Sequence, residues 1–129
     1  MKILTDIDIS SLITAAERLN EALQLQKTDI VRDATIQRFE FTYELAWKAM
    51  RKILIKRGSE ANTPKTVFRL AANDGIIDSL DLWFEFVNYR NNTPHVYNEK
   101  VADEIYIHIP IFYKMITQLI TKLKTDEFK

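Results

Sequence analysis

The stretch from Arg32 to Gly58 constrains the fold more than any other part of this chain. Its apolar residues recur at spacings of three and four, the period of one face of an α-helix. They are Ile36, Phe39, Tyr43, Ala46, Met50 and Ile53. Residues 39–45 taken alone alternate apolar and polar, which is typical of a strand, but the flanking residues are strong helix formers. Because Gly58 follows Lys56 and Arg57 as a helix stop should, the stretch predicts one long helix.

A second apolar row on the same helix consists of Phe41, Leu45 and Trp47, which lie off the first stripe. The helix is therefore apolar over most of its circumference and must be covered on two sides. One cover is the core of the chain itself. We expect the other to be a second subunit or a partner protein.

Helical patterns also precede and follow this stretch. A first helix is expected from Ser10 or Ser11, either of which can cap it, to about Gln26, and Asp29 is expected to cap the central helix. The first helix has Leu12, Ala16, Leu19 and Leu23 as its apolar stripe. Thr63 and Pro64 predict the start of a short helix, which Asn73, Asp74 and Gly75 would end.

Two further helices are expected in the second half of the chain. Ser79 would cap a segment in which Trp83, Phe86, Val87 and Arg90 share a face, and Asn98 would cap the last helix. The core side of that last helix carries Val101, Ile105, Ile109, Phe112, Ile116, Leu119 and Leu123. Because Pro110 lies within this pattern and removes one backbone hydrogen bond, we expect a kink or break there.

The length and composition predict a single domain over residues 1–129, an all-α, antiparallel four-helix bundle with an extra short helix. The absence of cysteine excludes disulfides, thiolate metal sites and cysteine nucleophiles. A formal net charge of zero provides no overall field to attract nucleic acid or an anionic membrane. No apolar run approaches the roughly 20 residues of a membrane span, and no signal peptide pattern is present, so a cytoplasmic protein with no membrane partner is expected.

The candidate site is the polar segment from Arg90 to Tyr97. Pro94 is expected to push Thr93 out of the helical region, so that the chain turns and Arg90 can face His95. In an extended stretch His95 and Tyr97 would project to one side, and the following helix N-terminus would offer free N–H groups to a phosphate.

Structural explanations for the same residues remain open. Arg90 can complement a helix dipole, His95 can be an ordinary surface residue, and Tyr97 can pack against the last helix. An Arg and a His at such a spacing also occur often by chance.

Three blocks of the sequence resemble the nucleotidyltransferase substrate-binding protein family, a branch of the HEPN superfamily. They are RFEFTYELAWK (38–48), TPKTVFRLAANDGIID (63–78) and WFEFVNYRNNTPHVYNEKVADEIY (83–106). The resemblance covers nearly the whole chain. It implies an antiparallel helical bundle that forms a homodimer and is encoded beside a minimal nucleotidyltransferase protein, with which it forms a complex.

The resemblance also implies roles for particular residues. HEPN ribonucleases carry an Arg and a His with four to six residues between them and a polar residue after the Arg. Arg90, Asn91 and His95 match this pattern, with four residues between the Arg and the His. In the toxin branch, the partner nucleotidyltransferase acts as antitoxin and transfers AMP to a tyrosine two residues past the His. Tyr97 occupies that position. Members of the substrate-binding branch, in contrast, are named as non-catalytic partners.

The implied chemistry is a metal-independent RNA cleavage, for which no cofactor and no metal is expected. It needs a deprotonated 2′-hydroxyl, a protonated leaving oxygen and stabilisation of charge on the phosphoryl oxygens. His95 can move a proton near neutral pH, Arg90 can bind the phosphate, and Asn91 can orient either. An acid–base pair needs two proton-transfer groups, but each subunit has only one motif histidine. A homodimer in which the two 90–97 segments face each other would supply two. AMP on Tyr97 would block the phosphate site and repel the RNA backbone.

Other features have simpler interpretations. The basic end of the central helix is expected to be a solvated face, with an RNA-backbone track as the alternative. It comprises Lys48, Arg51, Lys52, Lys56 and Arg57. His108 is expected to be a surface or partly buried residue, because no Arg precedes it at the required spacing. The many aromatic residues are expected in core and interface, with base stacking a minor alternative. A helical bundle that only mediates interactions is a further alternative function.

Overall fold

The computed structural model describes residues 7–125, and in this range the chain forms helices and turns without any strand. The helices are α1 (Ser10–Leu23), α2 (Asp29–Lys56), α3 (Pro64–Asn73), α4 (Leu80–Asn92), the short 3-10 helix η2 (Thr93–His95) and α5 (Glu99–Leu123). The predicted all-α bundle with one extra short helix is therefore confirmed.

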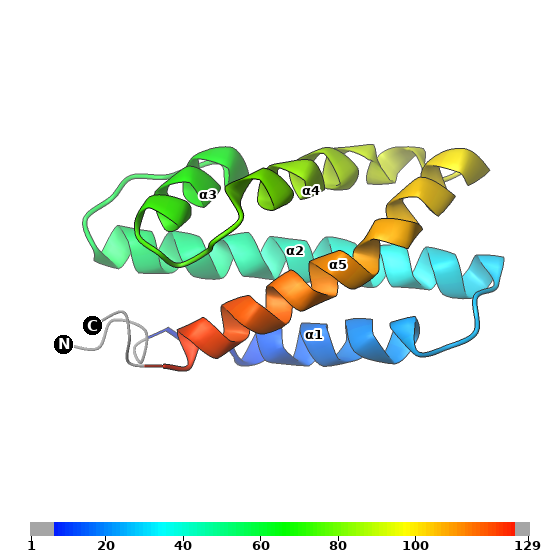
Figure 1. The fold of residues 1–129 in the computed structure, drawn as a ribbon, viewed down its shortest axis with the longest axis horizontal. Coiled ribbons are helices and arrows are strands. Elements are labelled where there is room, and N and C mark those ends of the chain that lie inside the picture. The colour runs from blue at the N-terminus through cyan, green and yellow to red at the C-terminus, as the bar shows by residue number, and fades with distance from the viewer. Residues whose placement is uncertain (1–6, 126–129) are drawn as a thin grey trace.

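The long helix α2 is the centre of the bundle. It packs against α1, α3 and α5, while α1 also packs against α5 and α3 against α4. Figure 1 shows α1 and α2 lying antiparallel, α3 and α4 following one another along one side, and α5 crossing the bundle diagonally. The turn between α4 and α5 lies at the end of the bundle where α2 begins (Figure 1).

The apolar stripe predicted for α2 forms the core. All six residues of that stripe are buried, and Phe39 makes ring contacts with Tyr43, Phe86 and Phe112. The Phe39 and Phe112 rings meet edge to face with centroids 4.8 Å apart, an arrangement that aromatic quadrupoles favour. The spacing of three and four places these six residues on one face of α2, where the other helices cover them. The short apolar–polar alternation of residues 39–45 therefore did not produce a strand.

The second apolar row of α2 is only partly covered within the chain. Phe41, Leu45 and Trp47 are each half-buried, and Phe41 lies beneath the guanidinium of Arg18 at 5.5 Å. Phe41 and Leu45 also line a shallow depression of about 320 Å³ against α1. The expected cover from a second protein stays a prediction.

The starts of α1 and α2 differ from the predictions. Asp8, rather than a serine, accepts hydrogen bonds at the start of α1, from the Ser10 backbone N–H at 2.9 Å and the Ser10 hydroxyl at 2.6 Å. Thr28, rather than Asp29, caps α2 by accepting from the Val31 N–H at 3.1 Å, and α1 ends at Leu23, three residues before Gln26. In both helices the accepting oxygen belongs to a residue earlier in the sequence than the predicted cap.

The two helix ends predicted from glycine are confirmed. Gly58 and Gly75 have φ angles of +89° and +77°, which side chains rarely adopt. After each, the next N–H bonds back to the last turn: Ser59 to the Leu54 carbonyl at 2.9 Å and Ile76 to the Ala71 carbonyl at 2.8 Å. These bonds satisfy carbonyls that the helices leave free.

The predictions for the start of α3, the start of α4 and Pro110 in α5 had different outcomes. Thr63 caps α3 with Pro64 at the first position, as predicted, whereas Ser79 precedes α4 without making a side-chain cap bond. Helix α5 runs through Pro110 without the break that was one of the two expected outcomes. Pro110 is exposed, so the carbonyl left without its donor can turn to water.

Between residues 7 and 125, none of the helices combines the length and apolarity needed to cross a membrane.

Candidate functional site at the turn between α4 and α5

The turn between α4 and α5, residues 90–98, is helical from Arg90 to His95, and its last residue, Asn98, is extended with ψ 118°. Thr93 has φ −60° and ψ −27°, so the prediction that Pro94 pushes it out of the helical region is wrong. Pro94 has no N–H to donate to the Arg90 carbonyl four residues earlier. The Thr93 hydroxyl donates to that carbonyl instead, at 2.8 Å, and the Thr93 N–H also donates to it. These bonds keep the chain coiled through η2.

Arg90 points back toward α2. Its Nη1 donates to the Thr93 hydroxyl at 3.0 Å and lies 3.9 Å from the Glu40 carboxylate. Its Nε lies 3.5 Å from Glu44 Oε1 and makes no hydrogen bond within residues 7–125, although the atom is buried. The two carboxylates therefore hold the guanidinium by charge, at distances too long for good hydrogen bonds.

His95 and Tyr97 lie on the surface of the same turn. Tyr97 is 82% exposed, His95 is exposed, and their ring centroids are 6.2 Å apart in an edge-to-face arrangement. Asn91 is exposed on the last turn of α4. The structure thus brings His95 and Tyr97 together, whereas Arg90 and His95 make no hydrogen bond with each other within the described chain.

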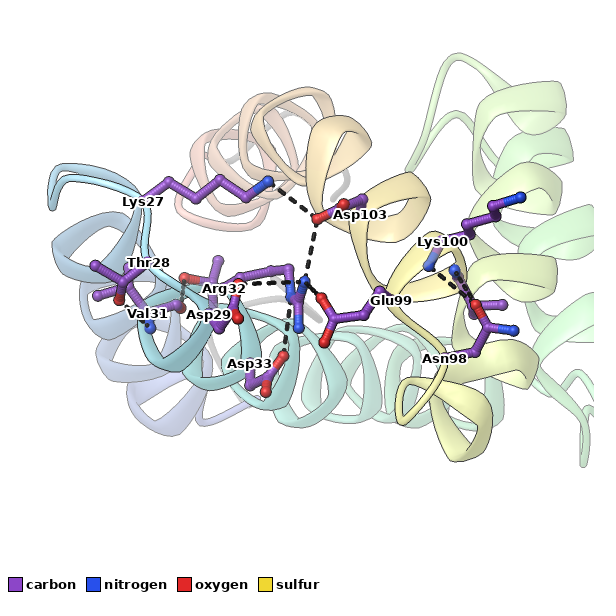
Figure 2. A network of polar contacts seen from close by, with 12 residues as sticks. Lys27, Thr28, Asp29, Val31, Arg32, Asp33, Asn98, Glu99, Lys100 and Asp103 are labelled. Carbon is purple, nitrogen blue, oxygen red and sulfur yellow. Dashed lines mark hydrogen bonds and ion pairs between the residues drawn. The ribbon is translucent and has the colours of Figure 1, made fainter.

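The start of α5 is fixed in two ways. Asn98 caps it, as predicted, by accepting from the N–H groups of Lys100 at 2.9 Å and Val101 at 3.4 Å. Arg32 of α2 then anchors the first turn, since its Nη1 donates to Glu99 at 2.7 Å and Asp103 at 3.2 Å. Figure 2 shows Arg32 reaching across to both carboxylates.

Arg32 is the centre of a polar network that the sequence analysis missed. Its side chain is only 3% exposed, and it also pairs with Asp33 at 3.0 Å and Asp29 at 3.7 Å (Figure 2). Asp103 is shared with Lys27, whose Nζ lies 3.0 Å away. A signal was present, because Arg32 precedes Ile36 by four and Phe39 by seven and so lies on the buried stripe.

The Arg32 network shifts the protonation of its members. Hydrogen bonding from Arg32 is the largest cause that lowers the pKa of Glu99, and hydrogen bonding from Lys27 is the largest for Asp103. The pKa of Arg32 is raised, chiefly by the bond to Glu99, although burial of its side chain acts in the opposite direction. Both carboxylates are therefore ionised at neutral pH and hold α5 in place.

His108 and the basic end of α2 lie apart from the turn or have structural partners. The His108 ring stacks on Tyr89 at 4.7 Å, and its Nδ1 lies 2.7 Å from the Glu104 carbonyl oxygen. Arg51 donates to the Ala61 carbonyl at 2.7 Å, while Arg57 pairs with Asp74 at 3.2 Å. Lys48, Lys52 and Lys56 are exposed, which fits the predicted solvated face.

The turn offers an exposed imidazole, an exposed phenol and a guanidinium with unused donors. An imidazole can transfer protons near neutral pH, and a guanidinium can bind a phosphate through two parallel hydrogen bonds. The exposed phenol can accept a transferred group. The geometry therefore suits chemistry on a phosphodiester or modification of the tyrosine.

Comparison with known proteins identifies a family with a similar sequence and solved structures with a similar fold. Residues 7–125 match the family described as "Nucleotidyltransferase substrate binding protein like". The chain is also 30% identical over 103 residues to a protein of Haemophilus influenzae named "Probable ribonuclease HepT", a match that covers 74% of this chain and 69% of that protein.

Two solved structures share the fold. A protein from Thermus thermophilus is 34% identical with a TM-score of 0.83, over 88% of this chain and 99% of that chain. A second structure, from Haemophilus influenzae, is described as the fold of a substrate binding domain of a nucleotidyltransferase. It is 25% identical with a TM-score of 0.83, over 92% of this chain and 100% of that one. The chain therefore belongs to the nucleotidyltransferase substrate-binding protein family, which confirms the resemblance carried by its three sequence blocks.

Proposed function

We propose that this chain is the partner subunit of a minimal nucleotidyltransferase and acts as a metal-independent endoribonuclease toxin. His95 moves a proton, Arg90 binds the scissile phosphate, and Asn91 orients one of them. The exposure of His95 on the helical turn that also carries Arg90 is the observation that carries the proposal. The similarity to the protein named "Probable ribonuclease HepT" supports it.

In this proposal the Tyr97 hydroxyl accepts AMP from ATP. Its oxygen forms a bond to the α-phosphorus, the bond from that phosphorus to the β-phosphate oxygen breaks, pyrophosphate leaves, and the phenol proton passes to solvent. The residue is 82% exposed, so a second protein can reach its hydroxyl, and its ring lies 6.2 Å from that of His95. An attached AMP adds a phosphate beside the imidazole and repels the RNA backbone. The nucleotidyltransferase then silences the ribonuclease by modifying this one side chain.

We also propose that the active form is a cytoplasmic homodimer. Within one chain Arg90 pairs with α2 and His95 faces solvent, so a single turn presents only one exposed histidine. Two turns that face each other across a two-fold axis bring two imidazoles and two guanidinium groups to one phosphodiester. The half-buried row of Phe41, Leu45 and Trp47 offers further apolar area for such contacts.

A second candidate function is a non-catalytic subunit that binds substrate for the nucleotidyltransferase. The observation that favours it is the position of Arg90, which pairs with Glu40 and Glu44 instead of facing His95. A subunit of this kind binds nucleotides without cleaving RNA.

The test is RNA cleavage by the purified protein in the presence of a metal chelator. We expect Arg90→Ala and His95→Ala to lower the cleavage rate by about 100-fold or more, since general acid–base catalysis contributes about that much. His108→Ala is the matched control, because it removes the other histidine and should leave cleavage unchanged. Cleavage that survives His95→Ala would contradict the ribonuclease proposal.

Mass spectrometry of the same preparation distinguishes a silenced enzyme from an inactive one. A mass increase of one AMP that disappears in Tyr97→Phe would show that the protein had been isolated in its modified form. Unmodified protein that cleaves none of several RNAs would favour the non-catalytic subunit.

A further inference from the structure

A depression of about 500 Å³ lies between α2, the start of α3 and the end of α4. Its lining includes Arg90 and Asn91, so it is continuous with the proposed catalytic turn, and the proposed function assigns nothing to its α3 side. Ligand pockets for small molecules commonly measure about 300–1,000 Å³, which makes the depression large enough for one nucleotide. The remaining lining residues determine what it can hold.

One wall of the depression is positive. It is the first turn of α3, where Thr63, Pro64 and Lys65 line the space. Lys65 is exposed and makes no ion pair or side-chain hydrogen bond within residues 7–125. As the second residue of a ten-residue helix, it also presents a backbone N–H that has no partner in the helix. An ammonium group and a free N–H at one helix end suit a phosphate oxygen.

The floor of the depression carries the hydroxyl group of Tyr43, a residue whose side chain is otherwise buried. Tyr43 is 2% exposed, and its ring lies between those of Phe39 and Phe68, at 6.1 and 6.0 Å. Its hydroxyl makes no hydrogen bond within the described chain, although the side chain lines the depression. Burial raises the pKa of Tyr43, so the hydroxyl stays protonated and can donate.

The opposite wall carries the negative charge of Glu44, which is balanced by Arg90. Glu44 would repel an anion, but its Oε1 faces Arg90 at 3.5 Å and its Oε2 accepts from the Trp47 indole N–H at 3.0 Å. Arg90 uses only Nη1 for a hydrogen bond, to Thr93. A phosphate is therefore favoured on the Lys65 side. The nucleoside would lie over Tyr43 and Val87, within reach of the free donors of Arg90.

We propose that this depression binds a nucleotide unit, with its phosphate on Lys65 and the start of α3 and its nucleoside on the Tyr43 hydroxyl. The inference deepens the proposed function by adding a subsite next to the scissile phosphate. The nucleotide comes either from an RNA chain or from a free nucleotide, and the chemistry of recognition is the same for both.

The test is binding to the full chain carrying His95→Ala, so that cleavage does not disturb the measurement. The probes are a short single-stranded RNA of mixed sequence and AMP. In this background we expect Lys65→Gln and Tyr43→Phe each to weaken binding by about fivefold. Lys65→Gln should also reduce the slope of log K against log salt by about 0.7 for the RNA, the value for one lost phosphate contact.

The matched control is Lys114→Gln, which removes an exposed lysine on α5 and should change neither probe. Tyr43→Phe carries its own folding control. Because the hydroxyl has no partner in the described chain, its removal should leave the unfolding temperature unchanged or raise it. Weaker binding by a variant that is equally stable cannot result from unfolding.

The two probes identify the source of the nucleotide. Weakening with RNA alone assigns the subsite to the RNA chain, and weakening with AMP alone assigns it to a free nucleotide. Unchanged binding of both probes by Lys65→Gln and Tyr43→Phe, or no binding by the parent, overturns the proposal. The outcome is independent of the cleavage assay, so a protein that binds through Lys65 without cleaving RNA keeps the subsite and loses only the ribonuclease function.

Discussion

Arg32 Nη1 donates to Glu99 Oε2 at 2.7 Å, and this bond joins the first turn of α2 to the first turn of α5 across 67 residues of sequence. The same guanidinium reaches Asp103, Asp33 and Asp29 (Figure 2). The segment that carries His95 and Tyr97 ends where this anchor begins.

We expect Arg32→Met to lower the free energy of unfolding by about 2 kcal/mol, because four carboxylates lose their shared cation. Methionine fills much of the same space and leaves no buried charge, so the fold should persist. Urea denaturation measures the change. Arg38→Met, which removes a more exposed arginine from the same helix, is the control and should cost less. Equal costs would contradict a special role for Arg32.

Acid should weaken the same anchor. The folded pKa values of Glu99 and Asp103 lie below their ordinary values of 4.5 and 3.8, so the unfolded chain binds more protons in that range. Their contribution is complete above about pH 4.5 and is lost as the pH falls through the folded pKa values. Denaturation between about pH 7 and about pH 3 should show a steeper loss of stability in the native sequence than in Arg32→Met. Parallel curves would show that other carboxylates dominate.

Glu44→Gln should change how Arg90 binds an anion such as an RNA phosphate. The amide keeps an acceptor for the Trp47 N–H but removes the charge 3.5 Å from Arg90 Nε. If Arg90 binds phosphate, we expect tighter RNA binding and a lower kcat, since repulsion falls and the guanidinium loses orientation. Both partners are about one third exposed, so the cost in stability should stay below about 1 kcal/mol.

The control for that measurement is Glu40→Gln. Glu40 lies farther from Arg90, at 3.9 Å, and its effect should be smaller. An unchanged KM in Glu44→Gln would show that substrate does not approach this side of Arg90.

Pro110→Ala should stabilise the protein. Proline inside a helix costs up to about 3 kcal/mol, and alanine restores an N–H that can bond to the Tyr106 carbonyl. Pro110 is exposed, so the change removes no core contact. We expect a gain of about 1 kcal/mol in thermal unfolding, with unchanged circular dichroism. A loss of stability would mean that α5 is bent at Pro110 and that its packing depends on the bend.

The periodic apolar residues were sufficient to predict the helices, because burial of a stripe such as Phe39, Tyr43 and Met50 does not depend on which partner covers it. The starts of α1 and α2 were harder to predict. Asp8, which lies before the cap position of α1, accepts the hydrogen bonds there instead of a serine, and Thr28 rather than Asp29 caps α2. Several adjacent side chains offer similar oxygens, and the final choice depends on local backbone angles.

The sequence predicted which residues lie together in the candidate turn but not how the Arg90 side chain is oriented. Sequence spacing placed Arg90, His95 and Tyr97 in one turn, and the structure keeps them there. It did not show that Glu40 and Glu44, from a helix distant in sequence, draw Arg90 inward. Nor did it show that the Thr93 hydroxyl replaces the N–H missing at Pro94. Both depend on tertiary contacts that no local pattern encodes.

The anchor between Arg32 and the start of α5 also determines when, during synthesis of the chain, the turn between α4 and α5 can be held in place. Glu99 and Asp103 follow His95 and Tyr97 in sequence, so a ribosome must release these residues from its exit tunnel before the turn can be held in place. Helices α1 and α2 can pair earlier, because their contacts need only the first part of the chain. A nascent polypeptide that still lacks α5 therefore displays its histidine and tyrosine on a segment whose downstream end is not yet anchored to α2.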